Sequence, residues 1–375
     1  MGHSNSDSSS LPAGRLASLD AYRGFTMLAM ASAGLSLAGL LKQHNLDWLA
    51  HQLDHAEWQG CTAWDLIQPS FMFLVGVAMP FSFARRQQQG ATWSSQLRHA
   101  LIRCLMLALI GMLMDTYFEH IVYIQFIRVL QQIALAYIPA FLVLHLGPRI
   151  QAAALLAVLV IHPALYVLYA RAQGLESAWE PGVNLGTRID EWLSVPALLS
   201  HHISFMPVSK GHYVAFNALS SAGTILSGVL AGELLGSRTS AIFKFLLLML
   251  AGIGCIYLGI ALTPYVPMIK RLWTTSFAVY AGGWTLIVMA GFYFIVDILK
   301  IRRWAFPLIV VGMNSIIMYV FSSIFRSDIN QVVEPFLRLA DLPKEVFVFL
   351  VALAALGLKW LFCYWLYVHK VFVKV

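Results

Sequence analysis

Long apolar runs dominate this chain and set the strongest limit on its fold. The first extends from about Asp20 to Leu41 and the second from about Thr62 to Ala84. Each has about 20 residues, which as a helix cross the roughly 30 Å hydrocarbon core of a bilayer. Similar runs follow at about 99–115, 124–145, 150–171, 215–236, 242–262, 272–296, 305–325 and 345–368.

These runs are continuously apolar, whereas lipid-facing β-strands alternate apolar and polar residues. A helix satisfies its own backbone polar groups in lipid. Only 11% of the residues are charged, compared with about 25% in a soluble domain. The sequence therefore predicts an all-α fold, a polytopic membrane helix bundle with about ten transmembrane helices.

Residues 1–14 are small and polar and lack the basic and apolar segments of a cleaved signal. We expect a disordered N-terminal tail over residues 1–14 and one membrane domain over residues 15–375. The cysteines contain no C-x-x-C pair, so neither a zinc site nor a disulfide framework is indicated, and we expect no bound metal. They are Cys61, Cys104, Cys255 and Cys363.

Basic residues gather in alternate short connections, which marks those connections as cytoplasmic. An even number of spans places both termini on that side, and the loop that contains His55 outside. The absence of N-x-S/T sequons and of a targeting peptide favours a bacterial inner membrane. The net charge of +7 is scattered over span ends, so we expect contact with lipid headgroups and no nucleic-acid partner. The cytoplasmic basic residues are Arg85, Arg86, Arg149, Arg238, Lys300, Arg302 and Arg303.

The segment between the first two runs concentrates polar chemistry at a membrane surface. His55 lies there among acidic residues, and Asp65 stands at the start of the next helix. An imidazole is the usual general base near neutral pH, and a carboxylate that accepts one ring N–H fixes the tautomer. We therefore expect His55 and Asp65 to be catalytic; the alternative is an ordinary solvated loop histidine.

Polar residues also occur within or beside other runs. Arg128, Gln131 and Gln132 lie within one and a half turns, and such residues in lipid usually face a cavity or a partner. Asn314 either forms a hydrogen bond between helices or lines a pocket. Lys270 and Trp273 are typical of interfacial anchors. The stretch 172–214, with Asp190 and a His201–His202 pair, is either a substrate-covering loop or a passive connector.

Several stretches, in this order, resemble the heparan-α-glucosaminide N-acetyltransferase family and its bacterial relatives, part of the transmembrane acyltransferases. The most distinctive is an H-x-x-W-x-G-x-T-x-x-D segment that begins at His55. The resemblance covers nearly the whole chain. The matching stretches are RLASLDAYRGFTMLAM at 15–30, HAEWQGCTAWDLIQPSFMFLVGVAM at 55–79, RVLQQIALAY at 128–137, GVNLGTRIDEWL at 182–193, TILSGVLAGELL at 224–235, KRLWTTSFAVYAGG at 270–283, GMNSIIMYV at 312–320 and LYVHKVFVKV at 366–375.

The resemblance implies a membrane acyltransferase that moves an acetyl group from cytosolic acetyl-CoA to an amino sugar or glycan on the other side of the membrane. His55 aligns with the histidine assigned as catalytic in that family. We expect the co-substrate acetyl-CoA to contact Arg128, Gln131, Asn314, Arg98 and Arg103. We expect the acceptor to contact Trp58, Lys270, Trp273 and Asp190, and the architecture allows a homodimer.

Four positions depart from the family pattern. An asparagine of the first span corresponds to Gly34, the asparagine of W-N-G to Gln59, the arginine of L-Q-R to Gln132, and the asparagine before Lys270 to Ile269. These losses leave the acceptor open. A multi-spanning sugar permease without acyl-transfer chemistry is the main alternative, because buried polar residues also line translocation paths. A non-enzymatic scaffold would give no reason for His55 and Asp65.

Overall fold

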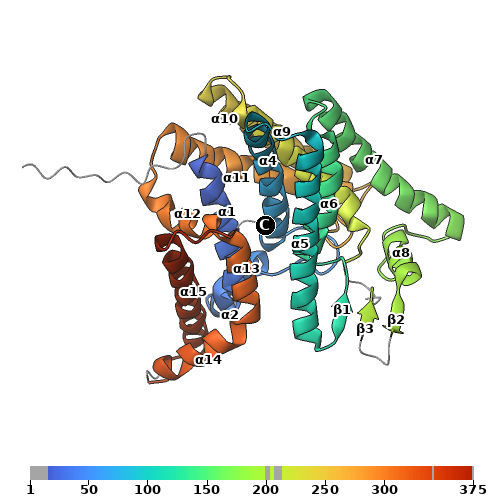
Figure 1. The fold of residues 1–375 in the computed structure, drawn as a ribbon. Coiled ribbons are helices and arrows are strands. Elements are labelled where there is room, and N and C mark those ends of the chain that lie inside the picture. The colour runs from blue at the N-terminus through green and yellow to red at the C-terminus, as the bar shows by residue number, and fades with distance from the viewer. Residues whose placement is uncertain (1–15, 199–202, 207–212, 340–341, 374–375) are drawn as a thin grey trace, which may run out of the picture.

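The computed structural model describes residues 16–198, 203–206, 213–339 and 342–373 (Figure 1). The tail expected over residues 1–14 and the His201–His202 pair lie outside these residues. The helices are α1 (Ala17–Ser32), α2 (Leu37–Gln43), α3 (Asp47–Gln52), α4 (Ile67–Gln88), α5 (Trp93–Glu119), α6 (Val129–Leu144), α7 (Pro148–Gln173), α8 (Leu185–Leu193), α9 (Asn217–Gly236), α10 (Ala241–Leu262), α11 (Thr275–Phe292), α12 (Phe306–Met313), α13 (Ser315–Ile324), α14 (Arg326–Leu337) and α15 (Lys344–Val368).

Within these residues, eight helical segments are long and apolar enough to cross a membrane. A ninth span results if α12 and α13 are counted together, although they bend by 72° at their junction. The remaining predicted run, 124–145, contains α6, a helix of 16 residues that is shorter than the other spans. The predicted all-α polytopic membrane bundle is confirmed, and each predicted run overlaps a described helix.

The path of the chain defines two faces of the bundle. Asp65 lies just before α4, and Arg85 lies near its other end. We call the ends of the bundle the His55 face and the Arg85 face. Because α5 returns antiparallel to α4, the end of α5 and the start of α6 lie on the His55 face. A small sheet joins the segment between α5 and α6 to the segment that follows α8. Its strands are in the order β1 (Val122–Ile124), β3 (Ile203–Phe205), β2 (Val195–Leu198).

Glycines let pairs of helices touch through their backbones. A Cβ at Gly76 of α4 would overlap the carbonyl of Ile225 in α9, and one at Gly228 of α9 would overlap the carbonyl of Phe73. Small residues at such crossings are the usual means of close helix packing in lipid. Gly24 of α1 and Gly312 of α12 form a second close crossing in the same way.

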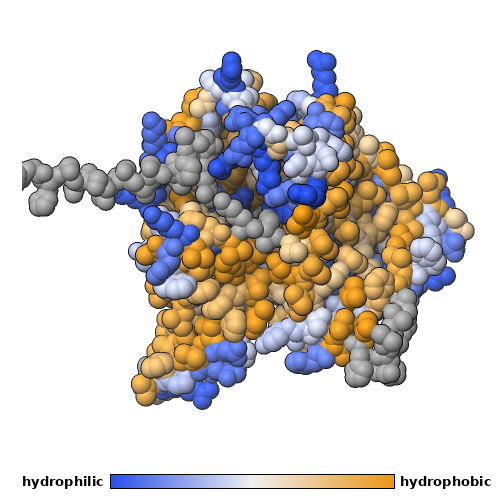
Figure 2. Space-filling view, viewed as in Figure 1, coloured by the Kyte–Doolittle hydropathy of each residue, from blue (hydrophilic) through white to orange (hydrophobic). Residues whose placement is uncertain are grey.

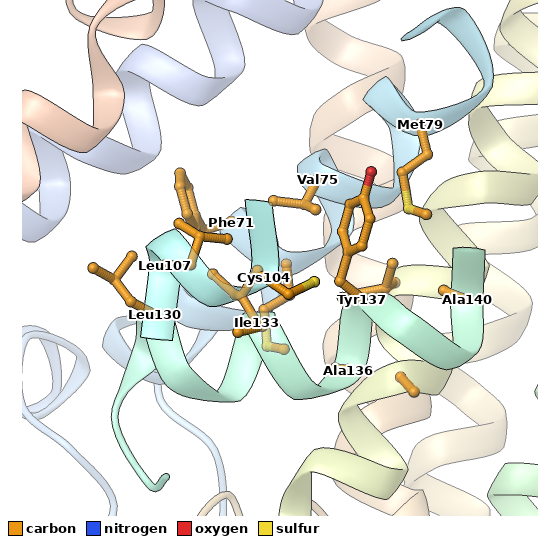
Figure 3. Packing of buried hydrophobic residues seen from close by; sticks show 14 of the residues in the cluster. Phe71, Val75, Met79, Cys104, Leu107, Leu130, Ile133, Ala136, Tyr137 and Ala140 are labelled. Atoms are coloured by element: carbon orange, nitrogen blue, oxygen red, sulfur yellow. The ribbon is translucent and has the colours of Figure 1, made fainter. Parts of the chain in front are cut away.

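The central apolar cluster lies where α4, α5, α6 and α9 meet. Figure 3 shows side chains of this cluster from α4 (Phe71 and Val75), α5 (Leu107) and α6 (Leu130 and Ile133). In contrast to α4 and α9, the helices α4 and α6 meet through side chains. Lipid would face the outer sides of the bundle, and Figure 2 shows hydrophobic residues over most of the middle of the visible face.

Two predicted continuous spans are broken. The first bends where Ala33, Gly34, Leu35 and Ser36 all adopt positive φ. This left-handed turn separates α1 from α2, and α2 then leads to the short helix α3. The other break lies at Asn314, whose side-chain amide donates to the carbonyl of Val371 and accepts from the N–H of Val373. Asn314 therefore holds the segment that follows α15.

Candidate active site at the His55 loop

The loop from Asp54 to Thr62 is held by local hydrogen bonds. The Thr62 hydroxyl donates to the carbonyl of Asp54 over 2.6 Å, which closes the loop on itself. Gly60 has a φ of 110°, a conformation that favours glycine, and its N–H donates to the carbonyl of Met268 over 2.8 Å. The loop is thus fixed to a segment more than 200 residues away in the chain.

His55 and Asp65 are in direct contact. His55 Nδ1 lies 2.7 Å from Asp65 Oδ1. The Asp65 side chain is 1% exposed, whereas that of His55 is 52% exposed. A carboxylate can only accept, so Nδ1 carries the proton of this bond, and Nε2 is left as the free base. The predicted imidazole and carboxylate therefore meet, with the reactive nitrogen on the exposed side of the ring.

Asp65 is held as an acceptor from several directions. Its Oδ2 accepts the backbone N–H groups of Ala56 and Thr62, each over 3.1 Å. Lys270 Nζ lies 3.1 Å from its Oδ1 and 3.3 Å from His55 Nδ1. An ammonium only donates, so the hydrogen bond of Lys270 goes to Asp65. Sequence alone suggested an anchor or a substrate contact for Lys270, and the structure places it in an ion pair with Asp65.

The two tryptophans proposed for the acceptor have different surroundings. Trp58 is partly buried, its indole N–H donates to the carbonyl of Trp179 over 3.2 Å, and the Arg271 guanidinium lies 5.9 Å above its ring. Trp273 is fully buried, and its indole donates to the hydroxyl of Thr224 over 3.0 Å. Trp58 therefore borders the site, whereas Trp273 packs in the core beneath it.

Asp190 belongs to a separate contact on the same face. It lies in α8, and both of its carboxylate oxygens are 3.2 Å from the N–H of Ala215, which they accept. The side chain is buried. Burial raises the pKa of the Asp190 carboxyl to about 6, although the bond from Ala215 partly opposes this. Asp190 thus connects α8 to the segment before α9.

Arg128 and Gln131 lie at the start of α6, on the His55 face. Arg128 forms an ion pair through Nε with the fully buried Asp115 of α5. Gln131 Nε2 donates to the other oxygen of Asp115 over 2.8 Å. Gly111 leaves room for this arrangement, because a Cβ there would overlap the Gln131 side chain. Asp115 was not singled out from the sequence, and its short spacing from Arg128 was the one signal that could have paired them.

The other proposed cofactor residues lie elsewhere. Arg98 is exposed near the start of α5, and the Arg103 guanidinium stacks 5.1 Å from the centre of the Tyr137 ring. Close to this end of α5, a cavity of about 560 Å³ opens on the Arg85 face. Cavities of this size hold small ligands. Its lining includes Phe83, Trp93, Gln96, His145 and Glu233.

Cys61 is the thiol nearest to the site in sequence. Burial, together with the charge of Asp65, raises its pKa to about 12, so the thiol remains neutral and is a poor nucleophile. Among the described residues, no group of three or more His, Cys, Asp or Glu side chains is placed to hold a metal ion. The ionisable side chains in direct contact at this loop are those of His55, Asp65 and Lys270.

Comparison with known proteins adds one finding. A family model described as heparan-alpha-glucosaminide N-acetyltransferase, catalytic, matches residues 15–254. The match includes His55, Asp65 and Arg128, and it ends before Lys270. No curated protein matches the chain.

We predict that Asp190 makes stability depend on pH. Because folding raises its pKa from 3.8 to about 6, its contribution is fully present below about pH 4 and is lost as the pH rises through 6. Asp190→Asn keeps an acceptor for Ala215 without the charge. It should raise the free energy of unfolding in detergent at pH 7.5 by on the order of 1–3 kcal/mol, seen as a higher unfolding midpoint, and change it little at pH 4. Equal midpoints at pH 7.5 would contradict this, and Glu191→Gln is the control on the same helix.

Proposed function

Because the chain belongs to the heparan-α-glucosaminide N-acetyltransferase family, we propose that it transfers an acetyl group from acetyl-CoA to the amine of an amino sugar or glycan at the His55 face. The observation that supports this most directly is the contact between His55 and the buried Asp65, which leaves Nε2 free on an exposed ring. This is the arrangement that a general base for an amine nucleophile requires.

In the proposed reaction, His55 Nε2 takes a proton from the acceptor amine as its nitrogen attacks the thioester carbonyl. A C–N bond forms, the C–S bond breaks, and CoA leaves as a thiolate that takes up a proton. The Asp65 carboxylate stabilises the imidazolium that forms. Lys270 and the N–H groups of Ala56 and Thr62 hold Asp65 in place, and Trp58 borders the space for the acceptor.

The donor would approach from the opposite face. In this proposal the cavity on the Arg85 face receives acetyl-CoA. Arg98 and Arg103, which lie on α5 outside the lining of the cavity, would be partners for its phosphates.

Pro80 of α4 already lines this cavity, so the helix from Ile67 to Pro80 separates it from the His55 loop, a rise of about 20 Å. The pantetheine arm is long enough to cover about half of the roughly 30 Å hydrocarbon core, and Arg128 and Gln131 lie at the His55 face. Asn314 is already bonded to the chain end.

The proposed sidedness follows from the basic residues of the Arg85 face, which retain it in the cytoplasm. Both termini would then be cytoplasmic, and the protein would lie in a bacterial inner membrane with its acceptor outside. A sugar permease is the competing function. A histidine–carboxylate pair in a permease would serve as a proton relay within the translocation path, whereas this pair lies in the loop and turn that precede α4.

We predict that His55→Ala lowers acetyl transfer by about 10²- to 10⁴-fold, because the general base is lost. Purified protein in detergent is incubated with labelled acetyl-CoA and a panel of amino sugars, and transfer is measured directly. His51→Ala, a change at an exposed histidine of α3, is the matched control and should transfer normally. Near-normal turnover by His55→Ala would contradict the mechanism, and no transfer by the unmodified protein to any acceptor would favour the permease.

We predict that Asp65→Asn slows transfer and that its effect is non-additive with His55→Ala. Asp65 acts through the imidazole, so once His55 is absent its loss should cost little more. The rates of acetyl transfer by the unmodified protein, the two single variants and the double variant are compared in a double-mutant cycle. Losses that add in the double variant would show that Asp65 has only a separate structural role at the start of α4.

We predict that position 55 is reached only from outside the cell. In a background without the four native cysteines, His55→Cys should react with a membrane-impermeant thiol reagent added to intact cells. Arg302→Cys should not, because the exposed Arg302 lies in a basic connection of the Arg85 face. Labelling is measured by mass shift, with permeabilised cells as the positive control. Labelling of position 55 only after permeabilisation would place the reaction on the cytoplasmic side.

A further inference from the structure

The seam between α4 and α6 contains a polar pair that the proposed mechanism does not use. Gln68 of α4 donates from Nε2 to Oε1 of Gln132 in α6 over 2.6 Å. Both side chains are buried, and Gln132 is 0% exposed. The pair is close in sequence to Phe71, Leu130 and Ile133 of the apolar cluster, and these three residues offer no hydrogen-bonding side chain. Figure 3 shows these three side chains.

This bond fixes the Gln132 amide and leaves its nitrogen without a partner. Oε1 accepts from Gln68, so the two N–H groups of Nε2 point elsewhere, and within the described part of the chain no acceptor meets them. A buried donor without an acceptor is rare in native structures and is unfavourable. The neighbouring Gln131 has the opposite deficit, because its Oε1 is also buried without a partner.

The position of the pair indicates what could satisfy the free donor. Gln68 follows Asp65 by three residues, about one turn, so the pair lies directly beneath the contact of Asp65 with His55. In the proposed function, the acyl end of acetyl-CoA must reach the depth of Gln68 and Gln132 from the Arg85 face. That end carries only carbonyl oxygens as strong acceptors, namely the thioester and the amides of pantetheine.

We propose that Gln132 Nε2, oriented by Gln68, binds a carbonyl oxygen of the acyl donor. This inference rests on the proposed function. Gln132 is then a residue that binds acetyl-CoA, and Gln68 is a positioning residue that acts through Gln132. Because the nitrogen is buried in the free protein, the ligand occupies the α4–α6 seam when it makes this bond. The same pair in a protein without a carbonyl ligand would gain nothing from a free donor.

The test compares binding with stability. In the double variant Gln68→Met and Gln132→Met, apolar side chains of similar shape replace both partners, a change that is neutral or stabilising when no ligand is present. We expect an unfolding midpoint in detergent equal to or above that of the unmodified protein. We also expect acetyl-CoA to bind about 10- to 100-fold more weakly, measured from its stabilisation of the full chain.

CoA serves as the second probe and distinguishes the two kinds of carbonyl. If the thioester oxygen is the ligand, the double variant should lose affinity for acetyl-CoA and keep its affinity for CoA. If an amide oxygen is the ligand, both affinities should fall together. Either result supports the carbonyl site. Thr285→Val is the control, since it removes a buried hydroxyl of α11 that is bonded to Gly282, and it should change neither affinity.

Two outcomes would overturn the inference. One is a double variant that binds acetyl-CoA as tightly as the unmodified protein. The other is a double variant that loses binding and also unfolds at a lower temperature, since the pair would then be structural. An unmodified protein that acetyl-CoA does not stabilise would instead contradict the proposed function itself, and the carbonyl site with it.

Discussion

Asp65 is the group on which the arrangement of the His55 face depends. It is a buried carboxylate, and a buried charge is tolerated only when it is paired and hydrogen-bonded. Its two oxygens meet that need by accepting from His55, from Lys270 and from the N–H groups of Ala56 and Thr62. The folding of the loop, the orientation of the imidazole and the position of the 266–274 segment are therefore consequences of one requirement.

The helical bundle could be predicted from the sequence because length and continuous hydrophobicity alone decide which segments can cross lipid. The breaks could not be predicted in this way. The turn at Ala33–Ser36 needs three non-glycine residues at positive φ, which local preference disfavours. Asn314 interrupts its span, and its amide contacts residues near the end of the chain, whose position only the folded bundle sets.

The candidate site was predictable to the extent that its residues are close in sequence. His55 and Asp65 are ten residues apart, and their contact could be inferred from chemistry. Lys270 is 205 residues from Asp65, so its basic, interfacial context indicated an anchor instead. Gln68 was missed for the same reason, since it pairs with Gln132, 64 residues away on another helix. Asp115 lies close to Arg128 in sequence but was not singled out, because the fold was needed to show that it is buried. Gln132, one of the four positions at which the sequence was expected to depart from the family pattern, is a member of the pair in the α4–α6 seam.

The glycine crossings limit where the bundle can open to a ligand. Where the backbones of α4 and α9 touch, or those of α1 and α12, no side chain lies between them that could change its rotamer to make space, so these crossings are closed to a ligand. The α10–α11 crossing at Gly252 and Gly283 has the same property. Space for a long ligand can therefore open only along seams filled by side chains, whose rotamers can change. The α4–α6 seam is of this kind, so a change of side-chain rotamers there would let α4 and α6 separate without opening a glycine crossing.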